Sequence, residues 1–390
     1  MVANACVLNE RIPIAEPEFG ANELKYVTEC LESGWISSIG PFVERFEQSI
    51  ARFCGARHAI ATANGTVALH LALAALGIGK GDEVIVPAMT FIATANAVHY
   101  TGASIVLVDV DSETWNIDPV AVERAVTRRT KAIVPVHLYG LPCDMDALRR
   151  IAKRHRLFLV EDAAESLGAT YKGTQTGVIG DIGTFSFYAN KTLTTGEGGM
   201  CLTNNNRLAA RMRHLRDHAM SKTRRYYHPE IGFNYRITAL QAAIGVAQAE
   251  RLEELLERKR QIAGWYDAAL AGIPGLVLPA RRNGLVSSNW MYSVLVLPAF
   301  GMSRDALAAA LREQGIDTRP FFWALHEQPP YRTSFRAKRG RALPVAARLA
   351  RQGLSLPSAS TLRLEQARIV AATIRSLARP LRSRRVARKE

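Results

Sequence analysis

Acidic residues, closely spaced cysteines and long apolar runs are all scarce in this chain of 390 residues. No apolar run is long enough to cross a bilayer, and Met1–Ile14 lacks the charged start and long apolar middle of a signal peptide. The five cysteines are widely separated and form no CxxC pair, which argues against a disulfide framework and a zinc site. We therefore expect a cytoplasmic protein with no membrane segment and no bound metal.

Because acids are few, the formal net charge is +15, which raises the question of nucleic-acid binding. Much of the excess is local, however: six basic residues fall within 379–390 and five within 332–341. The tail has no interleaved aromatic residues and contains no recognised nucleic-acid module. We expect 379–390 to be a solvated, disordered tail with no nucleic-acid partner. The second cluster is expected at most to attract an anionic substrate.

Short apolar runs alternate with amphipathic helical segments through the first half of the chain. Unbroken apolar strands between such helices indicate an α/β fold with a largely parallel sheet, covered on both faces. The predicted strands are His58–Thr62, Glu83–Pro87, Ser104–Val108, Ala132–Val136, Phe158–Glu161, Thr184–Phe187 and Met200–Thr203.

A long helix, Thr238 to about Ala263, is predicted to carry the chain away from this sheet. A smaller α/β unit follows, with a strand at Trp290–Leu297. We therefore predict three parts, which are an N-terminal arm with a large domain (1–255), a small C-terminal domain (256–378) and the basic tail (379–390).

One lysine follows a buried strand and precedes a glycine-rich turn. The run Phe185–Tyr188 is apolar and aromatic, Lys191 comes shortly after it, and Gly196-Glu197-Gly198-Gly199 follows. A lysine in such a place is poorly hydrated, which lowers its pKa toward a reactive free amine. Such an amine can form a Schiff base with an aldehyde, as in enzymes that use pyridoxal 5′-phosphate (PLP). The alternative is an ordinary solvated lysine beside a turn.

Two earlier strand ends carry groups suited to a phosphorylated ring. Gly65 and Thr66 begin a predicted helix, where exposed amides and a hydroxyl can bind phosphate. The alternative is that Thr66 only caps its helix. Phe91 follows the next strand, where an aromatic side chain can stack on a flat ring, although it fits a core position equally well.

Two acids end a third apolar strand, in the run Glu161-Asp162-Ala163-Ala164-Glu165. An ionised carboxylate at a buried strand end needs a cationic partner, and a protonated pyridine nitrogen would supply one to Asp162. Asp162 would then keep the ring protonated and electron-withdrawing. The alternatives are a helix cap and a metal ligand. Ser186, at the end of the strand before Lys191, could contact a phosphate.

Together these motifs resemble those of the DegT/DnrJ/EryC1/StrS family, and the resemblance extends from about Ile12 to Leu377. The family consists of PLP-dependent nucleotide-sugar aminotransferases of fold type I, the aspartate-aminotransferase-like fold, so the resemblance implies that fold, that cofactor and a transaminase. The motifs are Asn64-Gly65-Thr66, Glu161 to Glu165, Phe185-Ser186-Phe187 through Lys191, Gly196-Glu197-Gly198-Gly199 and Gly232-Phe233-Asn234-Tyr235-Arg236.

The resemblance also implies roles for individual residues around the ring. Lys191 would be the Schiff-base lysine and the proton shuttle. Asp162 would pair with the pyridine nitrogen, Glu165 would lie near the ring's phenolic oxygen, and Phe91 would lie on the ring face.

The phosphate and the substrate would be held by further residues. Gly65, Thr66 and Ser186 would hold the phosphate, and Asn234 would reach it from the partner subunit, which implies a homodimer with shared sites. For the sugar nucleotide the resemblance suggests three lining residues, Arg319, Phe322 and His326. Arg319 is equally well explained by a structural salt bridge.

Within the family the resemblance is strongest to the branch that aminates GDP-4-keto-6-deoxy-D-mannose. The segments that carry it include Asn289-Trp290-Met291-Tyr292, Thr318–Phe322 and Leu354–Ser358. Glutamate is expected as the donor, and pyridoxamine phosphate as the aminated cofactor; the product would serve a glycan such as an O-antigen. A UDP- or dTDP-linked keto sugar, a keto-cyclitol and, more remotely, a non-catalytic regulatory protein stay open. A related PLP-dependent dehydratase has histidine in place of the lysine, so Lys191 argues against it.

Overall fold

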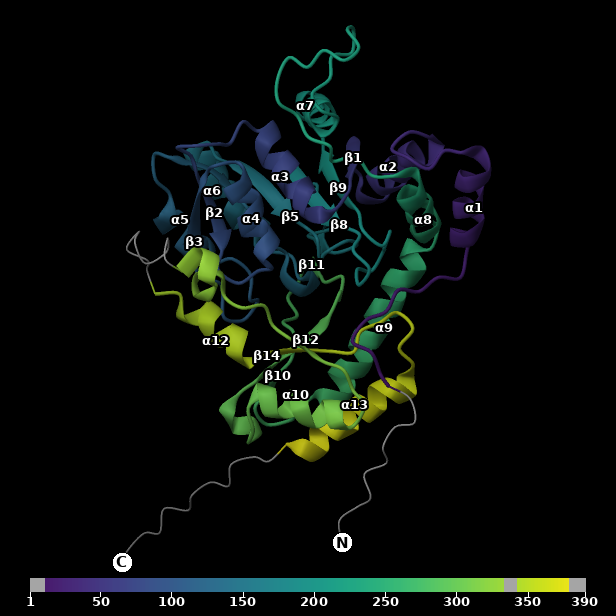
Figure 1. The fold of residues 1–390 in the computed structure, drawn as a ribbon. Coiled ribbons are helices and arrows are strands. Elements are labelled where there is room, and N and C mark those ends of the chain that lie inside the picture. Colours follow the sequence, from purple (N-terminus) through teal and green to yellow (C-terminus); the bar gives the residue numbers. More distant parts are fainter. Residues whose placement is uncertain (1–10, 333–341, 379–390) are drawn as a thin grey trace, which may run out of the picture.

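The computed structural model describes residues 11–332 and 342–378 (Figure 1). The predicted basic tail, 379–390, lies outside the described residues, and so does most of the second basic cluster. The described chain forms two main sheets, and a seven-stranded sheet built from residues 58–203 is the larger.

The larger sheet has the strand order β1-β9-β8-β5-β4-β2-β3. β9 runs antiparallel to both β1 and β8, and the remaining pairs are parallel, so the prediction of an α/β fold with a mostly parallel central sheet is confirmed. The strands are β1 (His58–Thr62), β2 (Glu83–Pro87), β3 (Ser104–Val108), β4 (Thr130–Ile133), β5 (Phe158–Asp162), β8 (Ile182–Ser186) and β9 (Gly199–Thr203).

Helices cover both faces of this sheet, which explains why its strands are continuous apolar runs. In β2, Val84 and Val86 pack in the core beneath the helices of one face, whereas Ile85 belongs to the core beneath the other. The first face carries α3 (Gly65–Ala75), α4 (Ile92–Tyr100) and α7 (Asn206–Arg216). The second carries α5 (Pro119–Ala125) and α6 (Met145–His155), with α1 (Glu23–Ser33) and α2 (Pro41–Cys54) near β1.

Two predicted elements differ from the observed ones. The strand expected at Ala132–Val136 ends at Ile133, because Pro135 has no N–H to contribute to a strand ladder. The single helix expected from Thr238 is in fact two helices, α8 (Ala239–Glu250) and α9 (Leu252–Leu270). The backbone leaves the helical region at Arg251, with φ −107° and ψ 8°, and the acids that follow favour a new helix N-terminus.

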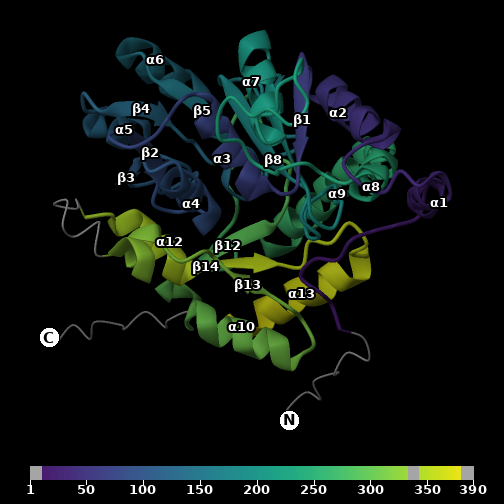
Figure 2. The ribbon, with the colours of Figure 1, turned by 45° about the horizontal axis from the view of Figure 1, so that its top comes forward.

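The smaller sheet is antiparallel, with the order β10-β12-β14-β13. Its strands are β10 (Leu276–Val277), β12 (Tyr292–Val296), β13 (Arg319–Pro320) and β14 (Gly353–Leu356), and it packs with α9, α10 (Arg304–Glu313) and α13 (Leu364–Leu377). Figure 2 shows α10 and α13 on the side that faces away from the larger sheet. The predicted domain boundary after residue 255 falls inside α9 and stays a prediction.

Short elements complete the described chain. A three-stranded sheet joins distant segments, because β11 (Leu285–Val286) pairs with β6 (Thr170–Tyr171), which in turn pairs with β7 (Thr174–Gln175). The remaining elements are three 3-10 helices, η1 (Leu138–Gly140), η2 (Pro298–Phe300) and η3 (Leu325–Glu327), and one α-helix, α12 (Pro344–Gln352).

Candidate active site

Lys191 lies in the turn after β8, where its backbone N–H donates to the Tyr188 carbonyl at 2.9 Å. Its amine lies 3.7 Å from the centroid of the Trp290 ring. Burial lowers the pKa of Lys191, whereas the charges of Glu165 and Asp162 act against that shift. The sequence prediction of a poorly hydrated lysine with a lowered pKa therefore agrees with the structure.

Asp162 ends β5, which is hydrogen-bonded in parallel to β8, the strand that leads to Lys191. Only 5% of Asp162 is exposed. Its carboxylate accepts from the Thr94 hydroxyl at 2.7 Å and from the Ala164 amide at 3.2 Å. Burial raises the pKa of Asp162, and the nearby Lys191 charge acts in the opposite direction. Residues 163–169 form turns and no helix, so the alternative that Asp162 caps a helix is wrong.

Glu165 lies beside these two groups and is 6% exposed. One of its carboxylate oxygens accepts from the Tyr139 amide at 2.7 Å. Burial raises the pKa of Glu165 to about 7, with the Lys191 charge opposing the shift. The structure therefore brings together one amine and two buried carboxyl groups. The charges of both acids act on the pKa of Lys191, and the Lys191 charge acts on the pKa of each acid.

The phosphate candidates also come together. They lie at the same edge of the sheet as Asp162, because Ser186 ends β8 and β8 runs parallel to β5. A Cβ atom on Gly65 would lie 2.8 Å from the Ser186 Cβ, so only glycine permits this approach of α3 to β8. Asn64 caps α3 by accepting from the Val67 amide, so the alternative that Thr66 is the cap is wrong. The first amides of α3, at Gly65 and Thr66, are left to bind a further partner.

Aromatic side chains line the neighbouring surface. Phe91 is 54% exposed, which rules out the alternative that it is a core residue. Its ring centroid lies 5.5 Å from that of Phe322, and Phe322 in turn stacks on Tyr139 at 5.6 Å. An exposed aromatic face beside a buried acid and amine offers a place for a flat ring.

The other two proposed substrate residues, Arg319 and His326, come from the same part of the chain as Phe322. The charge of Arg319, in β13, contributes to the lowered pKa of Lys191. No ion pair joins Arg319 to an acid within residues 11–332 and 342–378, so its alternative role as a salt-bridge residue finds no support in the described chain. His326 lies in η3, whose Leu325 amide donates to the Ala88 carbonyl near Phe91. Burial lowers the pKa of His326.

Asn234 lies in the segment that follows the loop after α7, where its backbone pairs with Asp217. Its side chain is exposed, and it lies in the segment that hydrogen-bonds to Ala63 through the Tyr235 carbonyl. Figure 1 shows that the loop before this segment, after α7, extends away from the body of the protein.

Two groups at the site did not follow from the sequence. Thr94 holds Asp162, and its hydroxyl also forms a hydrogen bond of 3.0 Å with the hydroxyl of Thr90, which lies just before α4. Tyr139 holds Glu165 and adopts a left-handed backbone, with φ 50°. Both follow the ends of parallel strands, and a search of every strand end would have found them.

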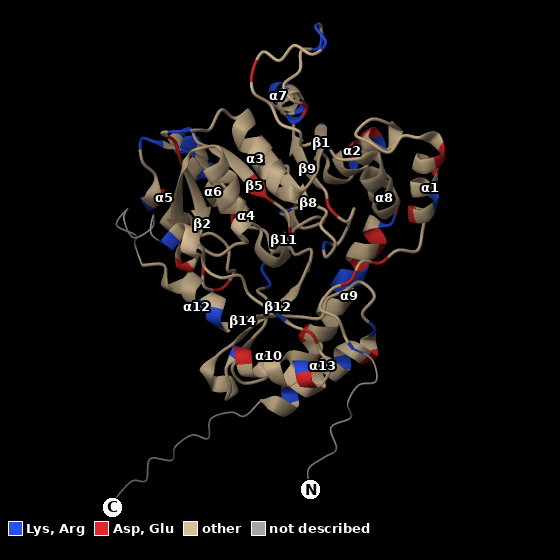
Figure 3. Ribbon diagram, viewed as in Figure 1, with Lys and Arg blue, Asp and Glu red and all other residues tan. Residues whose placement is uncertain are grey.

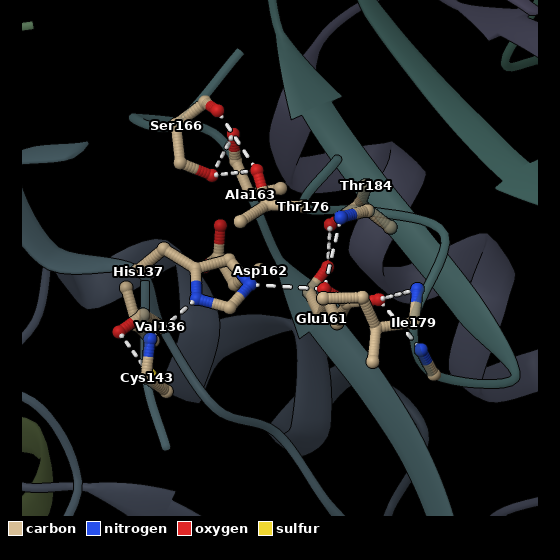
Figure 4. Close-up of polar contacts among 12 residues, drawn as sticks. Val136, His137, Cys143, Glu161, Asp162, Ala163, Ser166, Thr176, Ile179 and Thr184 are labelled. Carbon is tan, nitrogen blue, oxygen red and sulfur yellow. Dashed lines mark hydrogen bonds and ion pairs between the residues drawn. The ribbon is translucent and has the colours of Figure 1, made fainter. Parts of the chain in front are cut away.

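Glu161 precedes Asp162 but has different surroundings (Figure 4). It is fully buried, and it accepts from the amides of Gly177, Ile179 and Gly180 at 2.6–2.8 Å. It also lies 3.0 Å from the Nε2 atom of His137. These donors saturate Glu161, which makes it a structural acid.

These residues fit PLP by their chemistry. Exposed helix amides suit the phosphate, an exposed ring suits the pyridine face, a buried carboxylate with spare acceptor capacity suits the ring nitrogen, and the free amine suits the aldehyde. Among the described residues no group of three or more histidine, cysteine and acidic side chains could hold a metal ion.

Comparisons with known proteins show the family to which the chain belongs. Residues 17–375 match the model of the DegT/DnrJ/EryC1/StrS aminotransferase family. The chain is 50% identical over 327 residues to GDP-perosamine synthase from Caulobacter vibrioides, covering 82% of this chain and 87% of that protein.

Solved structures are also similar over nearly the whole chain. The structure of S. venezuelae DesV in complex with a ketimine intermediate is 37% identical, with a TM-score of 0.88, and the match covers 96% of this chain and 100% of that one. The structure of DesI in the presence of its TDP-sugar product is 34% identical, with a TM-score of 0.89, covering 95% and 94%. The predicted fold type I, the cofactor and the transaminase class are thereby confirmed. The chain belongs to the DegT/DnrJ/EryC1/StrS aminotransferase family and is a PLP-dependent aminotransferase.

Proposed function

We propose that this enzyme aminates C4 of a nucleotide-linked 4-keto-6-deoxy sugar, and that GDP-4-keto-6-deoxy-D-mannose is converted to GDP-perosamine with glutamate as donor. The observation that carries the chemistry is the approach of the Lys191 amine to the buried Asp162 and Glu165. The substrate rests on the similarity to GDP-perosamine synthase. Arg319 and Phe322 border the same site and are the proposed contacts to the sugar nucleotide, together with His326.

The roles of the residues follow from their surroundings. Bound PLP supplies an aldehyde that captures amino groups and a ring that accepts electrons from the adjacent carbon. Asp162 holds the proton on the ring nitrogen, and Gly65, Thr66 and Ser186 hold the phosphate. The Nζ atom of Lys191 takes a proton from one carbon and returns it to another, which its lowered pKa favours at working pH.

Glu165 regulates the charge around that amine. Because its pKa is about 7, it is present in both protonation states near neutrality. When ionised, it favours the charged form of Lys191, and when protonated, it can donate a hydrogen bond to an oxygen of the ring.

The enzyme is further proposed to act as a homodimer with shared sites. Large apolar side chains lie exposed in and around α1, and a partner subunit would cover them. They are Phe19, Leu24, Leu31, Trp35, Ile36 and Ile39, which are 47–80% exposed. The loop after α7, whose tip is basic in Figure 3, would bring Asn234 to the partner's phosphate site.

Shared sites can be tested by mixing inactive subunits. Co-expression of Lys191→Ala with Asn234→Ala should restore about a quarter of the activity, because about half of the dimers are mixed and each contains one intact site. Co-expression of Lys191→Ala with Asp162→Asn is the control, since both residues belong to one chain's site. Equal activities in the two mixtures would contradict the proposal.

A cytoplasmic location is proposed from the thiols. The four described cysteines, Cys30, Cys54, Cys143 and Cys201, are buried and unpaired, as expected in a reducing compartment. Within the described ranges no helix is both long and apolar enough to span a membrane.

The first experiment identifies the substrate from the visible absorption of the bound cofactor. The enzyme is treated with glutamate until the band of the aldehyde form is lost, and one keto sugar nucleotide is then added. We expect GDP-4-keto-6-deoxymannose to restore the band. Restoration only by the UDP- or dTDP-linked 4-keto-6-deoxyglucose would replace the proposed substrate and retain the chemistry. Failure of glutamate to change the band would overturn the donor.

The central role of Lys191 is tested by Lys191→Ala. We expect turnover to be lost, because Lys191 is the amine proposed to capture the aldehyde and to move the proton. Lys259, which lines the same pocket, is held by the carbonyls of Trp290 and Ser358. The measurement is product formation with saturating substrates, and Lys172→Ala, at an exposed lysine paired with Asp146, is the matched control. Appreciable transamination by Lys191→Ala would contradict the proposed role of Lys191.

A further inference from the structure

Trp290 contacts the catalytic lysine in two ways, although it comes from the segment before β12 of the smaller sheet. Its ring centroid lies 3.7 Å from the Lys191 amine. Its indole N–H donates to the carbonyl of Asn190 at 2.8 Å. The Trp290 side chain thus contacts both the amine of Lys191 and the backbone immediately before Lys191.

Trp290 is itself fixed from two other directions. Its ring stacks on Tyr139 with an interplanar angle of 13°, and Tyr139 also holds Glu165 through its amide. Its backbone carbonyl accepts from the amine of Lys259, in α9, at 3.3 Å. Lys259 is 4% exposed and donates as well to the carbonyl of Ser358. Lys259 therefore holds the neighbouring ends of β12 and β14 against α9.

We propose that Trp290 is a positioning residue for Lys191: its ring receives the amine whenever that amine is released from the cofactor, and its indole N–H fixes the turn that carries the lysine. Lys259 keeps Trp290 in this place. The inference rests on the proposed catalytic role of Lys191.

The physical reason is the flexibility of a free lysine. Once released, the amine is carried by a flexible stem of four carbons and is strongly hydrated. It must nevertheless stay within reach of the reacting carbon. The negative face of an indole attracts an ammonium group and excludes water from one side of it.

Three charged groups also act on Lys191. Asp162 and Glu165 favour its charged form, and Arg319 opposes it. The Trp290 ring adds to the effect of the two acids, so its removal should favour the neutral amine.

The test uses the full-length protein loaded with pyridoxamine 5′-phosphate, in which the lysine is free. The rate at which cyanate modifies Lys191 is measured against pH by peptide mass spectrometry, which gives the pKa of the amine. We expect Trp290→Leu to lower that pKa by about one unit. An unchanged or raised pKa in Trp290→Leu would overturn the proposal.

Trp290→Phe separates the two contacts and guards against misfolding of the leucine variant. Phenylalanine keeps an aromatic face but has no N–H, so we expect a smaller pKa shift together with faster hydrogen exchange of the Lys191 amide. Unchanged exchange would refute the proposed hold on the turn. Trp115→Phe is the matched control, since Trp115 is buried nearby and its indole N–H has no acceptor among the described residues.

The same experiment distinguishes this inference from the proposed function. If the unsubstituted protein neither binds pyridoxamine 5′-phosphate nor transaminates, the proposed function fails. If Trp290→Leu transaminates and retains the original pKa of Lys191, only the positioning role fails.

Discussion

Glu161 and Asp162 are adjacent acids on one strand, both buried, and they serve different purposes. Successive residues of a strand point to opposite faces of the sheet. Glu161 therefore points to the turn at 177–180, where three amides and His137 bond to it. Among the described residues, the Asp162 carboxylate accepts only from Thr94 and Ala164, and it lies near an amine. A buried acid saturated by protein donors is structural, whereas one with spare acceptor capacity is available to a ligand.

His137 lies between the two acids. Its Nδ1 atom accepts from the Cys143 amide, so its Nε2 atom holds the proton and donates to Glu161. Its own amide donates to the Asp162 carbonyl at 3.2 Å. The structural acid therefore fixes the end of the strand on which the functional acid is placed.

The largest effect is expected for Asp162→Asn. An amide cannot hold the ring-nitrogen proton by charge, so we expect kcat/KM to fall about 100-fold or more, within the range of a positioned acid–base group. Urea unfolding of the cofactor-free protein should be nearly unchanged, because the amide oxygen can still accept from Thr94 and Ala164 while the lost attraction to Lys191 is offset by the lower cost of burying a neutral group. Retention of full activity would break the contrast between the two acids.

Glu161→Gln should do the reverse. The glutamine NH₂ group would face N–H donors that now bond to the carboxylate, so we expect a loss of roughly 2–4 kcal/mol in the free energy of unfolding. The protein that remains folded should keep its kcat within a few-fold. Urea titration and steady-state kinetics on the same sample measure both, and a large fall in kcat without loss of stability would reverse the assignments.

Glu165→Gln extends the comparison of buried acids to the pH dependence of stability. The native pKa of Glu165, about 7, lies above the ordinary value of 4.5, so the native state binds more protons than the unfolded state between these values. This group therefore makes stability fall as pH rises from about 4.5 to about 7. Glutamine cannot ionise, so from pH 5 to pH 8 the variant should gain roughly 2–3 kcal/mol relative to the unsubstituted cofactor-free protein.

Parallel urea titrations of the two proteins at several pH values measure that difference. Glu161→Gln, at an acid of the same kind on the structural side, is the control. A difference that does not change with pH would show that Glu165 does not titrate in this range.

The smallest effect is expected for Thr94→Val. The variant removes one hydroxyl that bonds to the Asp162 carboxylate, so we expect kcat/KM to fall about tenfold. Because that bond favours the ionised form, its loss raises the pKa of Asp162 and moves the acid limb of the pH–rate profile to higher pH. Thr90 bonds to Thr94 and not to Asp162 itself, so Thr90→Val should change the pH–rate profile less. A shift to lower pH would contradict this account.

Several features of the fold and site follow from local pattern. The apolar runs predicted β1, β2 and β3 with their observed bounds, and the acids and lysine at strand ends predicted the site. The break between α8 and α9 at Arg251 was missed because the residues on both sides of it are good helix formers. The position of the break is set by tertiary contacts. The Arg251 guanidinium binds Glu18 of the N-terminal arm as well as Glu254. Short β14 was missed because four residues are too few to show a repeating pattern.

The sequence by itself determined the fold class and placed a lysine and a pair of acids at strand ends, because strand ends of a parallel sheet converge on one edge and each motif is contiguous. Only the tertiary structure decided which of two adjacent acids stays available and which groups hold Asp162, Glu165 and Lys191. Thr94, Tyr139 and Trp290 come from three distant segments. Hydrogen-bond saturation and ring contacts between such segments depend on packing, which no local pattern contains.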